Sequence, residues 1–202
     1  MNRLITSTLL FVGLCLIGQG FYMDVKAKLA QVLIDSSWNN RNPNSIPPKP
    51  WKWADTRAIA QLQVPRLNQS LNIMQDDSGE SLAFGPGYMP ASAPISGNGH
   101  TVIAGHRDSH FEFLKDIELG DHIFTENHHS IKQHYRVIDR QIIDVRNQQI
   151  PLFDHAQLTL ITCYPFEDFI PRGPLRLIIH AEPIFMHELT SNIGTAQAFG
   201  AN

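Results

Sequence analysis

The chain has 202 residues, enough for one globular domain with a substantial buried core and accessory segments. Its formal net charge is -3 at pH 7, so it lacks the broad positive field that favours nucleic-acid binding. Charged residues make up 17% of the sequence, which is too low for a disordered, solvated chain. We therefore expect a folded protein whose partner is neither DNA nor RNA.

The first predicted element is an apolar segment at residues 4–23, which contains no charged residue. As a helix this segment would span about 30 Å, the hydrocarbon thickness of a bilayer. We expect residues 1–23 to be an uncleaved membrane anchor, because no small-residue cleavage site follows at a suitable distance. A cleaved signal peptide is the alternative, since polar residues weaken the hydropathy and only Arg3 marks a basic start.

Residues 24–50 are predicted to form an amphipathic helix followed by a tether. The helical period continues beyond the anchor in four apolar residues, Val25, Leu29, Val32 and Leu33. The stretch NNRNPNSIPPKPW at residues 39–51 is too rich in Pro and Asn to hold a helix and predicts a stiff tether. We expect the folded domain at residues 51–185 and a polar, loosely ordered tail at residues 186–202.

Short apolar runs rich in β-branched residues and separated by turn residues fill the central region. These predicted strands cover residues 58–64, 101–104, 122–125, 135–138, 142–145, 158–161 and 175–180. One helical turn is expected within residues 77–84 and another within residues 111–114. Many short strands with few helices predict a mainly β fold whose sheet closes into a barrel, because closure removes exposed strand edges.

The sequence has two cysteines, Cys15 in the predicted anchor and Cys163 in the run LTLITCYPF. With Cys15 in lipid, Cys163 has no disulfide partner, and an unpaired thiol in an exported protein suggests chemistry. Cys163 follows a predicted strand, where the chain leaves the sheet and access is possible. Packing of a small apolar side chain is the alternative role. A thiol attacks an acyl carbon as the thiolate, which requires a nearby histidine or cation.

His106 and Arg176 are the candidate partners of this thiol. His106 lies in TVIAGHRDSH, directly after a short strand and Gly105, which allows a sharp exit from the sheet. Arg176 opens the run LRLIIH, where a charge among apolar neighbours requires compensation. A substrate oxyanion or a structural carboxylate would supply that compensation equally well. Arg172 is the competing arginine, although its PRGP context predicts an exposed turn.

In this order of strand-histidine, strand-cysteine and next-strand arginine the sequence resembles the sortases, cysteine transpeptidases built on an eight-stranded β-barrel. The resemblance rests on AGHRDSHF (104–111), LTLITCYPF (158–166) and GPLRLIIHAEP (173–183). Upstream, WKWAD (51–55) and LAFGPGYMPASAPISGNG (82–99) are similar to the sortases of Gram-negative bacteria, called class GN or marine proteobacterial sortases.

The resemblance implies catalytic roles for His106 as acid and base, Cys163 as nucleophile and Arg176 as stabiliser of the oxyanion. The implied substrate is a protein with a C-terminal sorting signal similar to LPXTG, cleaved through a thioacyl-enzyme and transferred to an unidentified amine acceptor. The resemblance implies neither a cofactor nor a metal ion. The implied location is the inner membrane, as a single-pass protein with its catalytic domain in the periplasm.

Asp108 suggests a triad in which a carboxylate orients His106. We interpret it instead as structural, because an acidic side chain on this loop could pair with Arg107 or cap the turn at Phe111.

Two alternative functions use the same residues differently. His100, His106 and His110 fall within eleven residues, and with Cys163 they could bind zinc in a periplasmic metal-dependent hydrolase. That site requires a helix across His106 and His110, which Gly105 and the preceding strand disfavour. A non-enzymatic barrel that binds surface proteins is the third hypothesis, and it leaves the placement of the cysteine, histidine and arginine unexplained.

Overall fold

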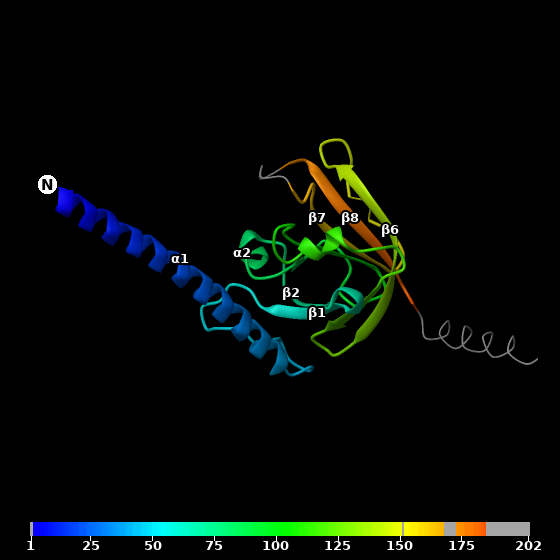
Figure 1. Cartoon of the computed structure of the whole chain (residues 1–202). Helices are drawn as coiled ribbons and strands as arrows, with labels where there is room; N and C mark the ends of the chain where they lie inside the picture. Colours follow the sequence, from blue (N-terminus) through cyan, green and yellow to red (C-terminus); the bar gives the residue numbers. More distant parts are fainter. Residues whose placement is uncertain (1, 151, 168–172, 185–202) are drawn as a thin grey trace, which may run out of the picture.

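A long N-terminal helix and a closed β-barrel make up the protein (Figure 1). The computed structural model describes residues 2–150, 152–167 and 173–184. Helix α1 (Asn2–Asn39) begins far from the barrel and reaches it at its C-terminal half. The predicted tail at residues 186–202 lies outside the described residues.

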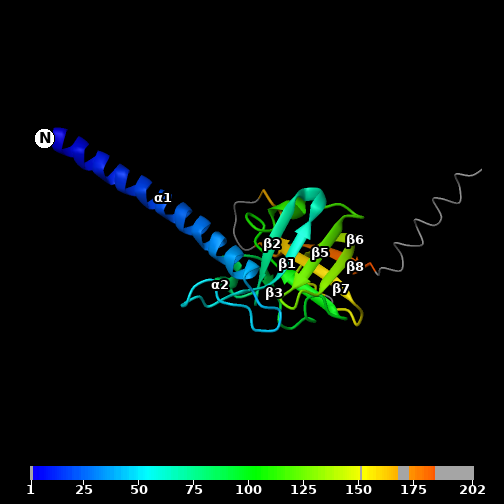
Figure 2. The same ribbon diagram turned by 90° about the horizontal axis from the view of Figure 1, so that it is seen from below.

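Within the described residues, eight strands close in the order β1-β2-β3-β4-β7-β8-β6-β5 (Figure 2). Most neighbouring strands are antiparallel, while β2 pairs with β3 and β4 with β7 in parallel. Their bounds are β1 (Ala58–Val64), β2 (Gln69–Met74), β3 (Gly87–Tyr88), β4 (His100–Ala104), β5 (His122–Asn127), β6 (Lys132–Asp144), β7 (Gln157–Cys163) and β8 (Leu175–Pro183). The prediction of a mainly β, eight-stranded barrel is confirmed.

In the described part of the chain, three short helices connect strands of the barrel, and two of them, α2 and η2, overlap the predicted helical turns. Helix α2 (Gly79–Leu82) begins after Ser78, whose hydroxyl accepts a hydrogen bond from the Ser81 backbone N–H as an N-cap. The 3-10 helix η2 (Glu112–Lys115) follows β4, and η1 (Pro65–Leu67) connects β1 to β2.

Strand β6 joins two predicted runs that the sequence separates with polar residues. Its residues from Lys132 to Asp144 form one strand, with an irregularity between Val137 and Asp139 that leaves Ile138 exposed. Strands β2 and β3 were not predicted. β2 (QSLNIM) mixes polar and apolar residues, and β3 contains only two residues, so neither carries a clear apolar pattern.

The barrel wall has two apolar faces at β7 and β8, so these strands contain nearly continuous apolar runs. Leu160 and Leu177 point into the main core inside the barrel and are fully buried. Ile161 and Ile178 alternate with them and belong to a second cluster on the outer face, with Val102 of β4. Both faces are covered, which explains the high β-branched content that made these strands recognisable.

Helix α1 packs on the barrel through a different stripe from the predicted one. Ile34 and Trp38 are buried in a small cluster with Ala58 and Met74 of the barrel. Val25, Leu29 and Val32 of the predicted stripe are exposed by 47%, 55% and 62%. They follow the helical period but lie on the opposite side of the helix axis from Ile34 and Trp38.

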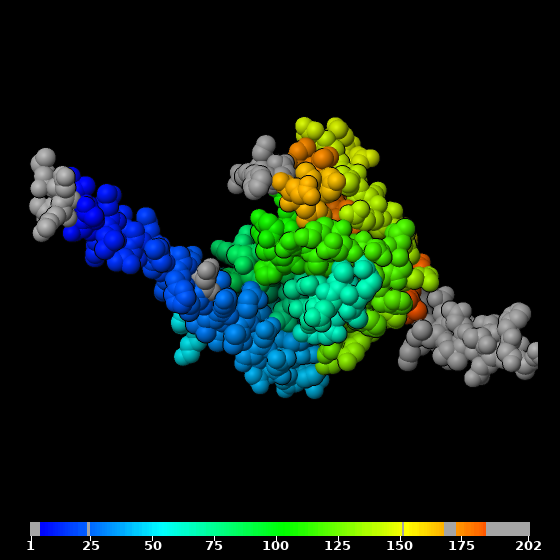
Figure 3. Space-filling view, viewed as in Figure 1, coloured from blue at the N-terminus to red at the C-terminus, as the bar shows by residue number. Residues whose placement is uncertain are grey.

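The N-terminal half of α1 projects free of the barrel, while its C-terminal half lies against it (Figure 3). One segment of α1, Ile5–Asn39, is long and apolar enough to cross a membrane, and its most apolar window is unburied.

The Pro- and Asn-rich segment after α1, predicted to be a stiff tether, is held against its neighbours. The Ser37 hydroxyl donates to the Pro48 carbonyl oxygen at 2.7 Å. Arg57, which directly precedes β1, donates to the Pro47 carbonyl at 3.1 Å. His129 Nδ1 lies 2.7 Å from the Pro43 carbonyl. The backbone carbonyl oxygens of these three prolines thus contact polar side chains of α1 and of the barrel domain.

Candidate active site

The parallel pairing of β4 with β7 brings the C-terminal ends of both strands to one edge of the barrel. Ala104 is the register partner of Ile161. The pairing extends one residue further, because the Gly105 N–H donates to the Ile161 carbonyl at 3.0 Å. His106 therefore leaves β4 beside the end of β7, where Cys163 lies.

Strand β8 completes the row, because its antiparallel register pairs Arg176 directly with Cys163. Successive side chains of a strand alternate between faces, so both residues share the outer face with Ile161 and Ile178. Cys163 and Arg176 thus lie on the outer wall at one end of the barrel, and not in its interior. Three neighbouring strands supply the histidine, cysteine and arginine that the sequence predicts, in the spatial order β4, β7, β8.

The three side chains differ in exposure and in bonding. His106 is exposed, whereas Cys163 and Arg176 are partly buried. Arg176 Nη1 donates to the carbonyls of Gly173 at 2.6 Å and Leu175 at 2.9 Å. Neither bond uses Nε or Nη2, both acceptors are neutral carbonyls, and among the residues that the structure describes no carboxylate pairs with this guanidinium. The competing Arg172 lies outside the described residues.

The loop that carries His106 is fixed to β7 by contacts that the sequence did not suggest. The Thr162 hydroxyl donates to the Gly105 carbonyl at 2.8 Å. Arg107 Nη1 donates to the Pro165 carbonyl at 2.6 Å, which joins the segment after the histidine to the segment after the cysteine. Thr162 and Arg107 are positioning residues that sequence reasoning missed. The only signal for them was their adjacency to Gly105, His106 and Cys163.

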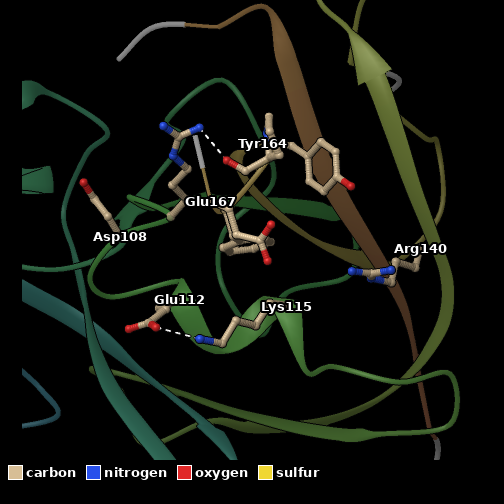
Figure 4. Close-up of a pocket in the computed structure, with 9 residues that line it drawn as sticks. Asp108, Glu112, Lys115, Arg140, Tyr164 and Glu167 are labelled. Carbon is tan, nitrogen blue, oxygen red and sulfur yellow. Dashed lines mark hydrogen bonds and ion pairs between the residues drawn. The ribbon is translucent and has the colours of Figure 1, made fainter. Parts of the chain in front are cut away.

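A cleft of about 540 Å3 lies beside this edge, next to the residues that follow Cys163 (Figure 4). Its wall carries charges of both signs, and a Glu112–Lys115 ion pair at 2.7 Å crosses part of it. The labelled lining residues are Asp108, Glu112, Lys115, Arg140, Tyr164 and Glu167. Mixed charges of this kind suit a polar or zwitterionic group better than an apolar one.

Asp108 lines this cleft and does not cap the turn at Phe111, whose N–H donates to the His106 carbonyl at 2.9 Å. The zinc hypothesis lacks its helix, because His106 to His110 form a turn. Among the residues that the structure describes, no three His, Cys, Asp or Glu side chains are grouped to hold a metal ion.

His100 belongs to a buried hydrogen-bonded chain on the outer face below the cysteine. The Phe153 backbone N–H donates to His100 Nδ1 at 3.1 Å, so the imidazole proton resides on Nε2, 2.7 Å from the Thr159 hydroxyl. That hydroxyl lies 2.8 Å from His180 Nδ1, and Gln141 Nε2 lies 2.8 Å from His180 Nε2. This chain fastens the segment between β6 and β7 to the barrel wall.

Burial sets the protonation of these histidines. Burial, and then the nearby His180 and His155, lower the pKa of His100 to about 4. Burial also lowers the pKa of His180, against the opposing effect of Asp139. At the edge of the site, burial and the neighbouring His106 lower the pKa of His110.

Comparison with known families decides the class of this site. Residues 62–184 match the Sortase domain family, which is more than half of the chain. The chain belongs to the sortase family. Family membership supports a cysteine transpeptidase activity. The row of His106, Cys163 and Arg176 is the candidate site for that activity.

Individual sortases resemble the chain over much of its length. Sortase D of Bacillus subtilis (strain 168) is 25% identical over 207 residues, covering 91% of this chain and all of the relative. Sortase A from Corynebacterium diphtheriae is similar in structure, with a TM-score of 0.56, 25% identity, and coverage of 81% of this chain and 84% of that one. The pilus-related sortase C of Group B Streptococcus gives a TM-score of 0.55 and 25% identity, covering 81% and 90%.

Gly105→Ala should destabilise the protein, because an added Cβ would lie 2.7 Å from the Phe111 ring beneath the histidine loop. Overpacking of this kind costs about 1–3 kcal/mol, measurable as a lower midpoint in thermal unfolding. Gly79→Ala is the matched control, because nothing lies within 4 Å of its added Cβ. Equal melting temperatures for the two variants would contradict the close contact.

Acidification should weaken the fold through His100. Its folded-state pKa of about 4 is below the ordinary 6.5, so the unfolded chain takes up the proton first as the pH falls. The stabilisation that neutral His100 gives the fold is therefore fully present above pH 6.5, and it declines as the pH falls from 6.5 to about 4. The stability difference between the wild type and His100→Gln should shrink by roughly 2 kcal/mol from pH 7 to pH 4.5 in denaturant titrations. A difference that stays constant with pH would contradict the buried neutral histidine.

Proposed function

We propose that this sortase cleaves a C-terminal sorting signal similar to LPXTG and transfers the new carboxyl end to an amine acceptor. Cys163 is the nucleophile, His106 is the general acid and base, and Arg176 binds the oxyanion. The observation that carries the proposal is the direct pairing of Cys163 with Arg176 beside the strand end that leads into His106. This row is exposed enough at His106 to admit a polypeptide substrate.

The first half-reaction forms the thioacyl-enzyme. The Cys163 thiolate attacks the scissile carbonyl carbon, and a C–S bond forms as the carbonyl oxygen gains negative charge. Arg176 stabilises that oxygen through guanidinium nitrogens that the Gly173 and Leu175 carbonyls do not engage. Protonated His106 gives its proton to the departing amine while the C–N bond breaks.

The second half-reaction regenerates the thiolate. An incoming amine attacks the thioester carbon, neutral His106 accepts the proton of that amine, and the C–S bond breaks. The cleft beside Cys163 supports the entry of an acceptor that carries both an amine and a carboxylate, because its lining combines three carboxylates with three cationic side chains: Asp108, Glu112 and Glu167 with Arg107, Lys115 and Arg140. Carboxylates favour a cationic amine near the thioester before it loses its proton.

The outer wall beneath Cys163 is apolar and closely packed. Ile161 precedes Cys163 by two residues on the same face, and Ile178 lies beside it on β8. Together with Val102 they form an apolar floor, over which Met89 and Ile150 pack. Val102 and Ile178 are fully buried and Ile161 is 5% exposed, so this floor supports the wall from beneath, and the signal would place its scissile bond at the cysteine above it.

The proposed location is the inner membrane of a Gram-negative cell, with α1 spanning the bilayer once and the barrel in the periplasm. The exposed apolar residues of the N-terminal half of α1 support the span. The stretches at 51–55 and 82–99 support the Gram-negative class. An anchored enzyme meets a membrane-bound substrate at a raised effective concentration without added affinity.

Cys163→Ala should abolish the covalent intermediate while preserving the fold. The side chain is partly buried at a strand end, so loss of one sulfur leaves little cavity. Mass spectrometry of the full chain with LPXTG-containing peptides should detect an acyl adduct on the wild type and none on the variant.

Cys15→Ala is the matched control for this experiment, because the only other cysteine lies exposed on α1 and should leave the adduct unchanged. An adduct on Cys163→Ala, or none on a wild type treated with a broad set of sorting peptides, would refute the proposal. Inhibition by a chelator without inhibition by a thiol-alkylating reagent would favour the zinc hydrolase instead.

Arg176→Ala should lower kcat/KM by roughly 100-fold or more, because one oxyanion donor is lost. Arg172→Ala should change kcat/KM little, and the pair of variants separates the two arginines that the sequence left in competition. The measurement is the rate of peptide cleavage in the presence of an amine. A larger loss for Arg172→Ala than for Arg176→Ala would reassign the role.

A further inference from the structure

We propose that a groove between α1 and residues 51–53 binds the interfacial layer of an anionic phospholipid bilayer and seats the barrel on the membrane surface. This inference rests on the proposed span of α1 but goes beyond it, since a single span fixes neither the height nor the orientation of the attached domain. We call this hollow the helix groove.

The helix groove has a volume of about 640 Å3 and is almost wholly apolar. Its two walls come from α1 and from the segment that leads into the barrel. The lining includes Met23, Lys26, Leu29, Leu33, Trp53 and Phe84. Trp53 is 80% exposed, an unusual state for the largest apolar side chain when it faces only water.

The helix groove is held open by specific contacts. Gln31 Nε2 donates to the Phe84 carbonyl at 2.8 Å, which ties α1 to the end of α2. The rings of Trp51 and Phe84 meet edge to face with centroids 5.4 Å apart. Ile34 and Trp38 anchor the next turns of α1 in the barrel. Figure 1 shows α2 beside α1 at this junction. The hollow is therefore part of the fold.

The position of the helix groove along α1 indicates its occupant. Apolar residues are exposed along the projecting half of the helix up to Met23, which also lines the groove. The groove continues to Leu33, about 15 Å further along the helix axis. A bilayer has an interfacial layer of about 5–8 Å outside its hydrocarbon core, so a tilted α1 would keep this length within or just above that layer. The exposed Val25 and Leu29 lie within the same stretch.

The chemistry around the helix groove matches an anionic lipid surface. Tryptophan is enriched at membrane–water interfaces, because its ring is apolar and its N–H remains solvated. Residues 23–33 and 49–53 contain four lysines, Lys26, Lys28, Lys49 and Lys52, and all four are exposed. The acidic residues nearby are Asp24 in the sequence and Asp55 and Glu80 in the adjoining hollow, so the lysines exceed them by one. The lysines attract acidic headgroups while the apolar floor contacts the interfacial layer.

Tryptophan fluorescence of the full chain reconstituted into vesicles tests this inference. The vesicles contain phosphatidylglycerol and phosphatidylcholine, with or without bromine atoms on the acyl chains near the interface. Bromine should quench the wild-type emission roughly twofold, since two of the three tryptophans lie at the groove. The double variant W51F/W53F retains only Trp38, which is buried against the barrel, and should lose most of the quenching.

Lysine variants test the charge. Lys26→Gln with Lys28→Gln should reduce bromine quenching in vesicles that contain phosphatidylglycerol. Lys132→Gln is the control, because Lys132 is also exposed but lies near Glu126, beyond the C-terminal end of α1. Equal effects of the two lysine changes would overturn the role of the lysines.

A carbonate wash separates this inference from the membrane anchor. If the chain remains in washed vesicles but the wild type and W51F/W53F are quenched equally, the anchor stands and the seating is overturned. If Trp53 is protected from aqueous acrylamide but is not quenched by bromine, the groove is covered by a protein partner or a second copy of the chain. That result would also overturn the proposed seating on lipid. Release of the chain by carbonate would overturn both the anchor and the seating.

Discussion

The site depends on one constraint, the parallel pairing of β4 with β7 in a barrel whose other long strands are antiparallel. Parallel strands end at the same edge, so the chain segments that leave them must run side by side. This pairing brings Gly105, at the start of the histidine loop, beside Thr162 of β7, 57 residues further along the chain, and a hydrogen bond joins them. The antiparallel β8 then begins where β7 ends, which adds Arg176 to the row without any further loop.

The outer face of the same three strands divides into layers with different physical roles. The row at Cys163 is open to solvent on one side, the apolar layer at Ile161 lies beneath it, and the hydrogen-bonded chain through Thr159 lies deeper. Each layer is two residues further along β7, because side chains on one face repeat with that period. The proposed chemistry, the apolar packing and the attachment of the β6–β7 segment are thus separated by distance along one strand.

Much of the barrel could be predicted from the sequence because its buried strands are rich in β-branched residues on both faces, as in β7. β2 and β3 could not, since their pairing is fixed by neighbours and their own residues carry no period. The order of His106, Cys163 and Arg176 was visible in the sequence, but their common edge required the strand register. Thr162 and Arg107 act through backbone carbonyls, which any hydroxyl or guanidinium can bind, so no motif distinguishes them.

The unbroken helix α1 has a mechanical consequence. A flexible linker would let the barrel sweep through a range of heights, whereas Ile34 and Trp38 lock the last turns of α1 to the wall of the barrel. With α1 in the bilayer as proposed, the rigid junction holds the cysteine at one fixed height above the membrane. Only client proteins that present their cleavage sequence at the matching elevation above the lipid would be processed, so the spacing between a client's own membrane segment and that sequence becomes a criterion of selection.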